Sequence, residues 1–146
     1  MKNKTIITAI RILSGMKINK VSNPAVKLAL LNDYIALKRA IQPAMEAKQE
    51  IVEKFQEDFR EEIDAVNALR SAGKPVAGHD EYLAAEKDTD RILKQFDEEE
   101  TEVILKKVSL DQFISSTKES DMSMEQIYRL VGVVVQDGQK AIMNEV

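Results

Sequence analysis

Residues 23–72 have the sequence NPAVKLALLNDYIALKRAIQPAMEAKQEIVEKFQEDFREEIDAVNALRSA and contain the longest helical pattern of the chain. Asn23 can accept a hydrogen bond from an unpaired backbone N–H, and Pro24 suits a first helical position. Two positions repeat every seven residues, one with Leu31, Lys38, Met45, Val52, Phe59 and Val66, the other with Tyr34, Ile41, Lys48, Phe55, Glu62 and Leu69. Nine of these twelve residues are apolar, which favours the seam of a helical hairpin or a coiled coil.

An unbroken helix over residues 23–72 would be roughly 70 Å long, which is more than a compact domain of this size encloses. The helix must therefore bend, project from the fold, or pack on a second copy. Pro43 lacks the N–H that would bond the carbonyl of Arg39, so it predicts a bend. A break into two helices at residues 40–42 is the alternative.

Helices are also expected on both sides of this stretch. An apolar stripe formed by Ile6, Ile7, Ile10 and Leu13 predicts a first helix over residues 3–14, followed by a connector over residues 16–22. The glycines and Pro75 within residues 71–78 predict a loop. Asp80 is expected to cap a third helix that runs to about residue 99, which gives an antiparallel hairpin.

The C-terminal part is harder to interpret. Residues 101–109 are rich in β-branched side chains and short, which favours a strand slightly over a buried linker. Ser109 with Gln112, and Ser123 with Gln126, have the spacing of capping boxes and predict two short helices. The expected fold is mainly α, with an elongated, coiled-coil-like hairpin, a small C-terminal helical part and at most one short strand. The expected segments are residues 1–22, 23–100 with a loop at 71–79, and 101–146, folding as one cooperative unit.

The composition restricts the chemistry. The 146 residues contain no cysteine and one histidine, His79, so thiolate metal sites, cysteine nucleophiles and most histidine-based schemes are excluded. No apolar run reaches the roughly 18 residues of a membrane span, and the N-terminus has the character of a mature cytosolic protein. The acidic run at residues 97–100 is interpreted as a solvated helix end, because consecutive helical carboxylates fan out around the axis. We therefore expect no cofactor, no metal and no enzyme activity.

Charge is unevenly distributed along the chain. Residues 1–48 carry nine basic and two acidic side chains, whereas residues 49–102 carry seven basic and seventeen acidic ones. Packing of the two regions against each other, in one chain or between copies, explains this asymmetry better than nucleic-acid binding does, because the basic region lacks interleaved aromatic residues.

One resemblance follows from these segments. The motifs Asn3-Lys-x-Ile-Ile-x-Ala and Ala29-Leu-Leu-Asn32-x-x-x-Ala36-Leu37, a long charged helix, and the later Glu102-Val-Ile-Leu-Lys-Lys-Val and Met124-Glu-x-Ile127-x-x-Leu130 resemble small tailed-bacteriophage proteins of unassigned function. The resemblance implies a phage or prophage origin, and hence a location in the bacterial cytoplasm or the virion. It implies no known activity and supplies no site residues.

Three functions remain open, in this order of preference. The first is a non-enzymatic protein-interaction or assembly protein that binds a protein partner or itself, with contacts from Met45, Val52, Phe55, Phe59, Ile127, Tyr128 and Val131. The second is an acidic inhibitor of a host nucleic-acid-handling or defence protein, in which Glu57, Asp58, Glu61 and Glu62 imitate the charge of nucleic acid. The third is nucleic-acid binding through phosphate contacts from Lys38 and Arg39.

Overall fold

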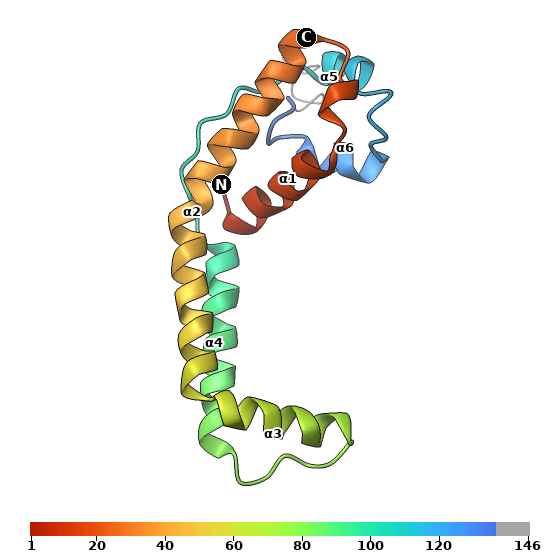
Figure 1. Cartoon of the computed structure of the whole chain (residues 1–146). Helices are drawn as coiled ribbons and strands as arrows, with labels where there is room; N and C mark the ends of the chain where they lie inside the picture. The colour runs from red at the N-terminus through yellow and green to blue at the C-terminus, as the bar shows by residue number, and fades with distance from the viewer. Residues whose placement is uncertain (137–146) are drawn as a thin grey trace, which may run out of the picture. The chain divides into compact units, whose positions relative to one another are not determined.

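The chain is mainly helical, as the sequence predicts. The structure is a computed structural model and describes residues 1–136. Its elements in chain order are α1 (Asn3–Gly15), the 3₁₀ helix η1 (Ile18–Lys20), α2 (Pro24–Asp58), α3 (Arg60–Ser71), α4 (Asp80–Glu98), α5 (Leu110–Ser116) and α6 (Met124–Leu130) (Figure 1). No helix within the described residues combines the length and the apolar character needed to cross a membrane.

The described residues form two compact units. Unit 1 comprises residues 1–41 and 100–136, and unit 2 comprises residues 42–99. Helix α2 belongs to both, and the boundary between Ile41 and Gln42 falls beside Pro43. The alternative of a break into two helices at residues 40–42 is wrong, because α2 continues through Pro43 to Asp58.

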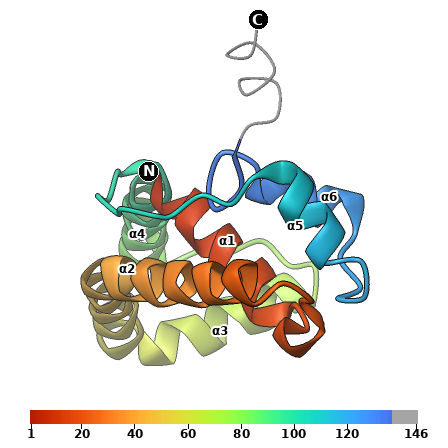
Figure 2. The ribbon, with the colours of Figure 1, turned by 90° about the horizontal axis from the view of Figure 1, so that it is seen from above.

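Unit 1 is built around the first half of α2. Asn23 accepts hydrogen bonds from the backbone N–H groups of Ala25, at 2.9 Å, and Val26, at 3.4 Å, which confirms the expected start of this helix. Figures 1 and 2 show α1 between this half of α2 and α6. The core residues come from α1, the first half of α2 and the C-terminal segments: Ile6, Ala9, Ile12, Leu13, Val26, Ala29, Leu30, Leu37, Ile41, Val108, Phe113, Leu130, Val133, Val134 and Val135.

The buried face of α2 differs from the predicted seam. Leu30 and Leu37 are 1% and 0% exposed, whereas Leu31, which was placed in the seam, is 39% exposed. Of the predicted seam residues in this half of the helix, Ile41 is buried, at 4% exposed. Leu31 and Lys38 are exposed, and the residue before each of them is buried instead. Adjacent apolar residues such as Leu30 and Leu31 fit two neighbouring seven-residue registers, and burial in the core of unit 1 selects the register of Leu30. A smaller correction applies to α1, where Ile7 and Ile10 are half-buried and Ala9 and Ile12 are buried.

Unit 2 contains an antiparallel helix pair, as the sequence predicts, but α3 and residues 72–79 connect its two helices instead of a loop alone. The second half of α2 lies beside α4 (Figure 1). The Lys48 ammonium lies 4.8 Å from the ring centre of Phe96, near the end of α4, and the Phe55 ring lies 5.6 Å from that of Tyr82, near its start. The order of these contacts along the two helices shows that they run in opposite directions.

The long helix ends earlier than expected. Phe59, with φ −124° and ψ 26°, separates α2 from α3, so the expected continuous helix to residue 72 is wrong. Figure 1 shows α3 running across the direction of α2 and α4. The break lets Val66 of α3 become fully buried and lets Arg70 reach Glu86 of α4. A straight continuation of α2 would lack these contacts within unit 2.

The expected loop and caps are largely confirmed. Residues 72–79 join α3 to α4, and Gly73 and Gly78 have the positive φ values that favour glycine, +67° and +79°. The prediction that Asp80 caps α4 is wrong: the carbonyl of His79 accepts the first helical bond, from Leu83 N–H at 3.0 Å, and Asp80 is the first residue of the helix. Ser109 caps α5, and Ser123 with Gln126 forms the complete capping box of α6.

Residues 101–109 do not form the strand that the sequence favours. They are an irregular extended segment, and among the described residues their only β-type pairing is an isolated bridge between Val108 and Val135. Their β-branched composition suits an extended backbone, but a strand also needs a partner strand, and no strand occurs within residues 1–136.

Candidate protein-interaction surfaces

An exposed apolar stripe lies on the first half of α2. Leu28 is 60% exposed, Leu31 39% and Ile35 44%. Their spacing of three and four residues places them on one side of the helix, and the α2 stripe is the name used below for these three residues. The interaction residues predicted from the sequence do not include these three, although Leu31 belongs to the predicted seam.

A small apolar pocket adjoins the α2 stripe. It has a volume of about 190 Å³ and is lined by Leu13, Ser14, Met16, Ile18, Leu30, Leu31 and Tyr34. Leu31 therefore belongs both to the stripe and to the pocket wall. The Lys38 ammonium lies 5.4 Å from the ring centre of Tyr34, at the same part of α2. An aliphatic side chain of a partner would find here an apolar recess with a cation close by.

Unit 1 presents a second exposed apolar pair on α6. Met124 is 82% exposed and Tyr128 is 75% exposed, and they lie one turn apart on the helix. Of the three residues proposed here from the sequence, Tyr128 is exposed, whereas Ile127 and Val131 are half-buried. The exposed surface of α6 is thus centred on Met124 and Tyr128.

In unit 2, the aromatic residues proposed for partner binding contact one another. The rings of Phe55 and Phe59 lie 5.4 Å apart, and that of Tyr82 lies 5.6 Å from Phe55 and 5.7 Å from Phe59. Tyr82 is only 2% exposed. Phe55 and Phe59 are therefore half-buried in a cluster that joins α2 to α4, and Val52 is half-buried as well. Met45 is the exposed member of the proposed set, at 39%.

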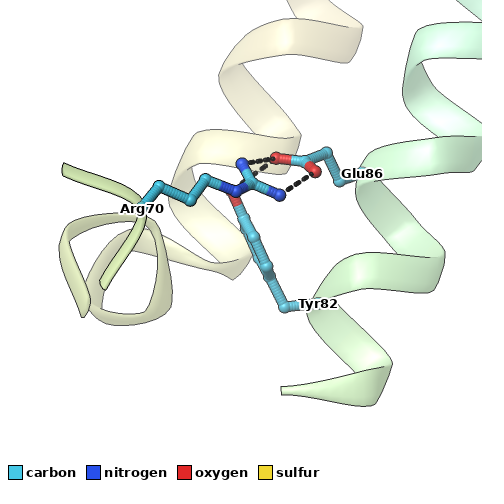
Figure 3. A network of polar contacts seen from close by, with 3 residues as sticks. All are labelled: Arg70, Tyr82 and Glu86. Carbon is cyan, nitrogen blue, oxygen red and sulfur yellow. Dashed lines mark hydrogen bonds and ion pairs between the residues drawn. The ribbon is translucent and has the colours of Figure 1, made fainter. Parts of the chain in front are cut away.

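A polar network fastens α3 to α4 next to this cluster (Figure 3). The Arg70 guanidinium donates two hydrogen bonds to the Glu86 carboxylate, at 3.0 and 2.8 Å, and the Tyr82 hydroxyl donates a third, at 3.0 Å. The hydrogen bonds from Arg70 lower the pKa of Glu86, whereas burial raises the pKa of Tyr82. The network has the geometry of a two-pronged arginine clamp between helices.

Acidic side chains surround the break between α2 and α3. Glu57, Asp58 and Glu61 are exposed, and Glu62 is half-buried with an oxygen 3.4 Å from Nδ1 of His79. These four residues are called the acidic corner below. The structure brings together the four carboxylates that the sequence singled out, and together with Phe59 and Arg60 they line one shallow depression.

The basic side chains proposed for phosphate contacts lie in unit 1. Lys38 and Arg39 are both exposed on α2. Asp33 is the only acidic residue among residues 1–45, and it is 2% exposed. The surface of α1 and of the first half of α2 therefore presents positive charges and no carboxylate of its own.

Asp33 is the polar residue that sequence reasoning missed. One carboxylate oxygen, Oδ1, accepts the backbone N–H of Lys106 at 2.9 Å, while Oδ2 is buried without a hydrogen-bond partner among the described residues. Burial raises the pKa of this carboxyl. Its position gives a usable signal: Asp33 lies three residues after Leu30 and four before Leu37, within an otherwise apolar helical face.

The last two observations concern metal ions and similarity to known proteins. Within residues 1–136, no group of three or more histidine, cysteine or acidic side chains is placed to hold a metal ion. Searches against protein-family models, curated proteins and solved structures found no match to the chain.

Proposed function

We propose that the chain is a non-enzymatic protein-interaction protein that binds a protein partner through the α2 stripe. The observation that carries the proposal is the exposure of Leu28, Leu31 and Ile35 on a helix whose opposite face is fixed in the core of unit 1. Exposed apolar residues in helical register on a rigid element are typical of helix-in-groove and helix-to-helix recognition. The adjoining pocket supplies a place for an anchoring side chain of the partner.

The charges around the stripe indicate the chemistry of the partner. Lys27, Lys38 and Arg39 lie on the same half of α2, and the only nearby carboxylate in the sequence, Asp33, is buried. An amphipathic helix with aliphatic residues on one face and acidic residues along its rim would complement this surface. Such binding should weaken as salt is added, since exposed charges are screened.

The experiment compares capture of partners by two variants. The test variant combines Leu28→Ser, Leu31→Ser and Ile35→Ser, and the control is Ile114→Ser on α5, where the side chain is also 44% exposed. Each purified chain is used as bait in extracts of the cells that produce it, and bound proteins are quantified by mass spectrometry. We expect the triple variant to lose at least about tenfold of a specific partner that the control retains. Equal recovery by both variants would contradict the proposal.

The acidic corner favours one alternative, an inhibitor that occupies a basic groove of a nucleic-acid-handling or defence protein. Glu57, Asp58 and Glu61 are exposed where the helix direction changes, so their charges are presented together. A variant with Glu57→Gln, Asp58→Asn and Glu61→Gln should then lose a basic, salt-sensitive partner. Retention of every partner by that variant would exclude this alternative.

A phage or prophage origin belongs to the same proposal and rests on the sequence resemblance described above. It would make the chain an assembly factor or a small virion component. Detection of the chain in purified particles by mass spectrometry would support it.

A further inference from the structure

The pocket beside the α2 stripe lies between two lysines on one side of α2. Lys27, Leu31, Tyr34 and Lys38 follow one another at spacings of four, three and four residues, which places them on one side of the helix. Leu31 and Tyr34 line the pocket. At about 1.5 Å per residue, each lysine lies roughly 6 Å along the helix from the nearer of these two residues, or about one turn. The apolar recess is thus flanked by a positive charge on each side.

Neither lysine forms an ion pair among residues 1–136. The ion pairs within this part of the chain involve other basic groups. The Lys38 ammonium lies 5.4 Å from the ring centre of Tyr34, which is a neutral partner. An aromatic ring attracts an ammonium group but does not neutralise its charge. The charge of Lys38 is therefore available at the pocket wall to a carboxylate of a partner.

The pocket has room for one apolar side chain. Its volume is about 190 Å³, and an apolar cavity of about 150 Å³ holds a benzene molecule. A leucine, methionine or phenylalanine side chain therefore fits it. Three of the residues that line it are buried, namely Leu13, Met16 and Leu30. Because these three belong to the core of unit 1, the recess exists before a partner binds, which lowers the cost of binding.

We propose that this site binds an amphipathic helix of another protein through one apolar anchor residue, with one acidic residue about one turn before the anchor and another about one turn after it. The anchor enters the pocket, and the two carboxylates pair with Lys27 and Lys38. A turn of the partner helix has the same rise as a turn of α2, roughly 5.4 Å, so three or four residues separate the anchor from each acidic residue. The inference rests on the proposed function, because it defines the partner of the same surface.

The α2 stripe of a second copy does not fit as the occupant. It would bring Lys27 and Lys38 against the same two lysines, and like charges across an interface oppose binding. Asp33, the only acidic residue among residues 1–45, is 2% exposed and supplies no carboxylate to this surface. The acidic residues must therefore come from a different protein surface.

Selection from a phage-displayed library of helical peptides with randomised surface positions tests the charge pattern. The wild-type chain should enrich peptides in which an apolar residue has acidic residues three or four positions away on both sides. The double variant Lys27→Glu, Lys38→Glu should enrich basic residues at those flanking positions instead. The control Lys107→Glu, Lys118→Glu changes the net charge equally at exposed residues that line neither the pocket nor the stripe, and it should keep the acidic pattern. Enriched peptides without flanking acidic residues, or an unchanged pattern in the first double variant, would overturn the proposal.

Blocking the pocket tests the anchor. Ser14 is exposed and lines the pocket, so Ser14→Phe should fill the recess and raise the dissociation constant of the best selected peptide at least about tenfold. Ser115→Phe adds the same ring to an exposed residue of α5 and should leave the affinity unchanged. Fluorescence anisotropy measures both, on variants that keep the wild-type circular dichroism spectrum, and equal affinities would overturn the anchor.

The triple serine variant of the α2 stripe separates this inference from the proposed function. A wild-type chain that enriches no peptide over the triple serine variant would contradict both. Enriched peptides that require the stripe but lack the flanking acidic residues would contradict only the pairing with Lys27 and Lys38 and leave the proposed function standing.

Discussion

The two halves of α2 differ in how they are held, although they belong to one helix. Residues 24–41 bury Val26, Ala29, Leu30, Asp33, Leu37 and Ile41, whereas none of residues 42–58 is buried. The first half packs within unit 1 against segments from both ends of the described chain. The second half pairs with α4, and its apolar residues, such as Phe55 and Val52, stay half-buried.

A continuous seven-residue pattern therefore does not indicate a uniform environment along the helix. In the first half, a buried face fixes the helix and leaves the α2 stripe exposed on the other side. In the second half, most of the apolar surface is already used in contacts with α4. A surface displayed by a rigid helix is better suited to a partner than one that already serves its own unit.

The largest expected effect is at the centre of the buried face. Leu37 is fully buried, so Leu37→Ala should lower the free energy of unfolding by about 3 kcal/mol, from lost burial and an unfilled cavity. Val52→Ala, at a half-buried position in the second half, should cost less than about 1 kcal/mol. Denaturant titration of both variants measures the contrast, and equal losses would remove the distinction between the two halves.

The aromatic cluster is the strongest point of the second half. Phe55→Asp places a charge between Phe59 and Tyr82 and should cost about 2 kcal/mol of stability. Met45→Asp, at a side chain that is 39% exposed in the same helix half, is the matched control and should cost much less. If Phe55→Asp leaves the thermal midpoint unchanged, the contact between α2 and α4 is not stabilising.

Asp33 is the polar exception in the first half. Because burial raises its folded pKa above the ordinary value of 3.8, the folded state holds the proton up to a higher pH than the unfolded state does. Stability is then lost as the pH rises through this interval, and the penalty is complete above the folded pKa. Asp33→Asn should therefore raise the thermal midpoint at pH 7, and the gain should shrink as the pH approaches 3.8. A lower midpoint at pH 7 would show that the hydrogen bond to Lys106 outweighs the burial of charge.

The smallest expected effect concerns the Arg70 clamp. The pKa of Glu86 is lowered from its ordinary value of 4.5, so its contribution to stability is present above that value and is lost as the pH falls through the folded pKa. The pair is partly exposed, and the effect should be small and weaker in high salt. Thermal midpoints of wild type and Arg70→Gln between pH 3 and pH 7 should converge in acid, and a constant gap would contradict this role.

Local signals in the sequence predict the starts of α2, α5 and α6. Asn23 with Pro24, and Ser123 with Gln126, act through hydrogen bonds to the next few residues, so the sequence alone contains their whole cause. The break at Phe59 has no such signal, since neither glycine nor proline lies there. It depends on contacts of α3 with α4, which are distant in sequence.

The candidate site was less predictable for the same reason. Leu30 and Leu31 fit the helical repeat equally well, and the packing of the unit 1 core selects which of them is buried. Residues 101–109 have strand-like composition, but composition does not reveal a partner strand. Asp33 was visible as the only acidic residue among residues 1–45, yet its burial depends on the fold.

The most direct test of the α2 stripe is a photo-crosslinking amino acid placed at Leu31 or at Met45, which are both 39% exposed on the same helix. Each variant is produced in its native cell, irradiated, and examined for covalent adducts by mass spectrometry. We predict an adduct with another protein from position 31 and little from position 45. An adduct from position 45 with none from position 31 would place partner binding on the second half of α2 and contradict binding through the α2 stripe.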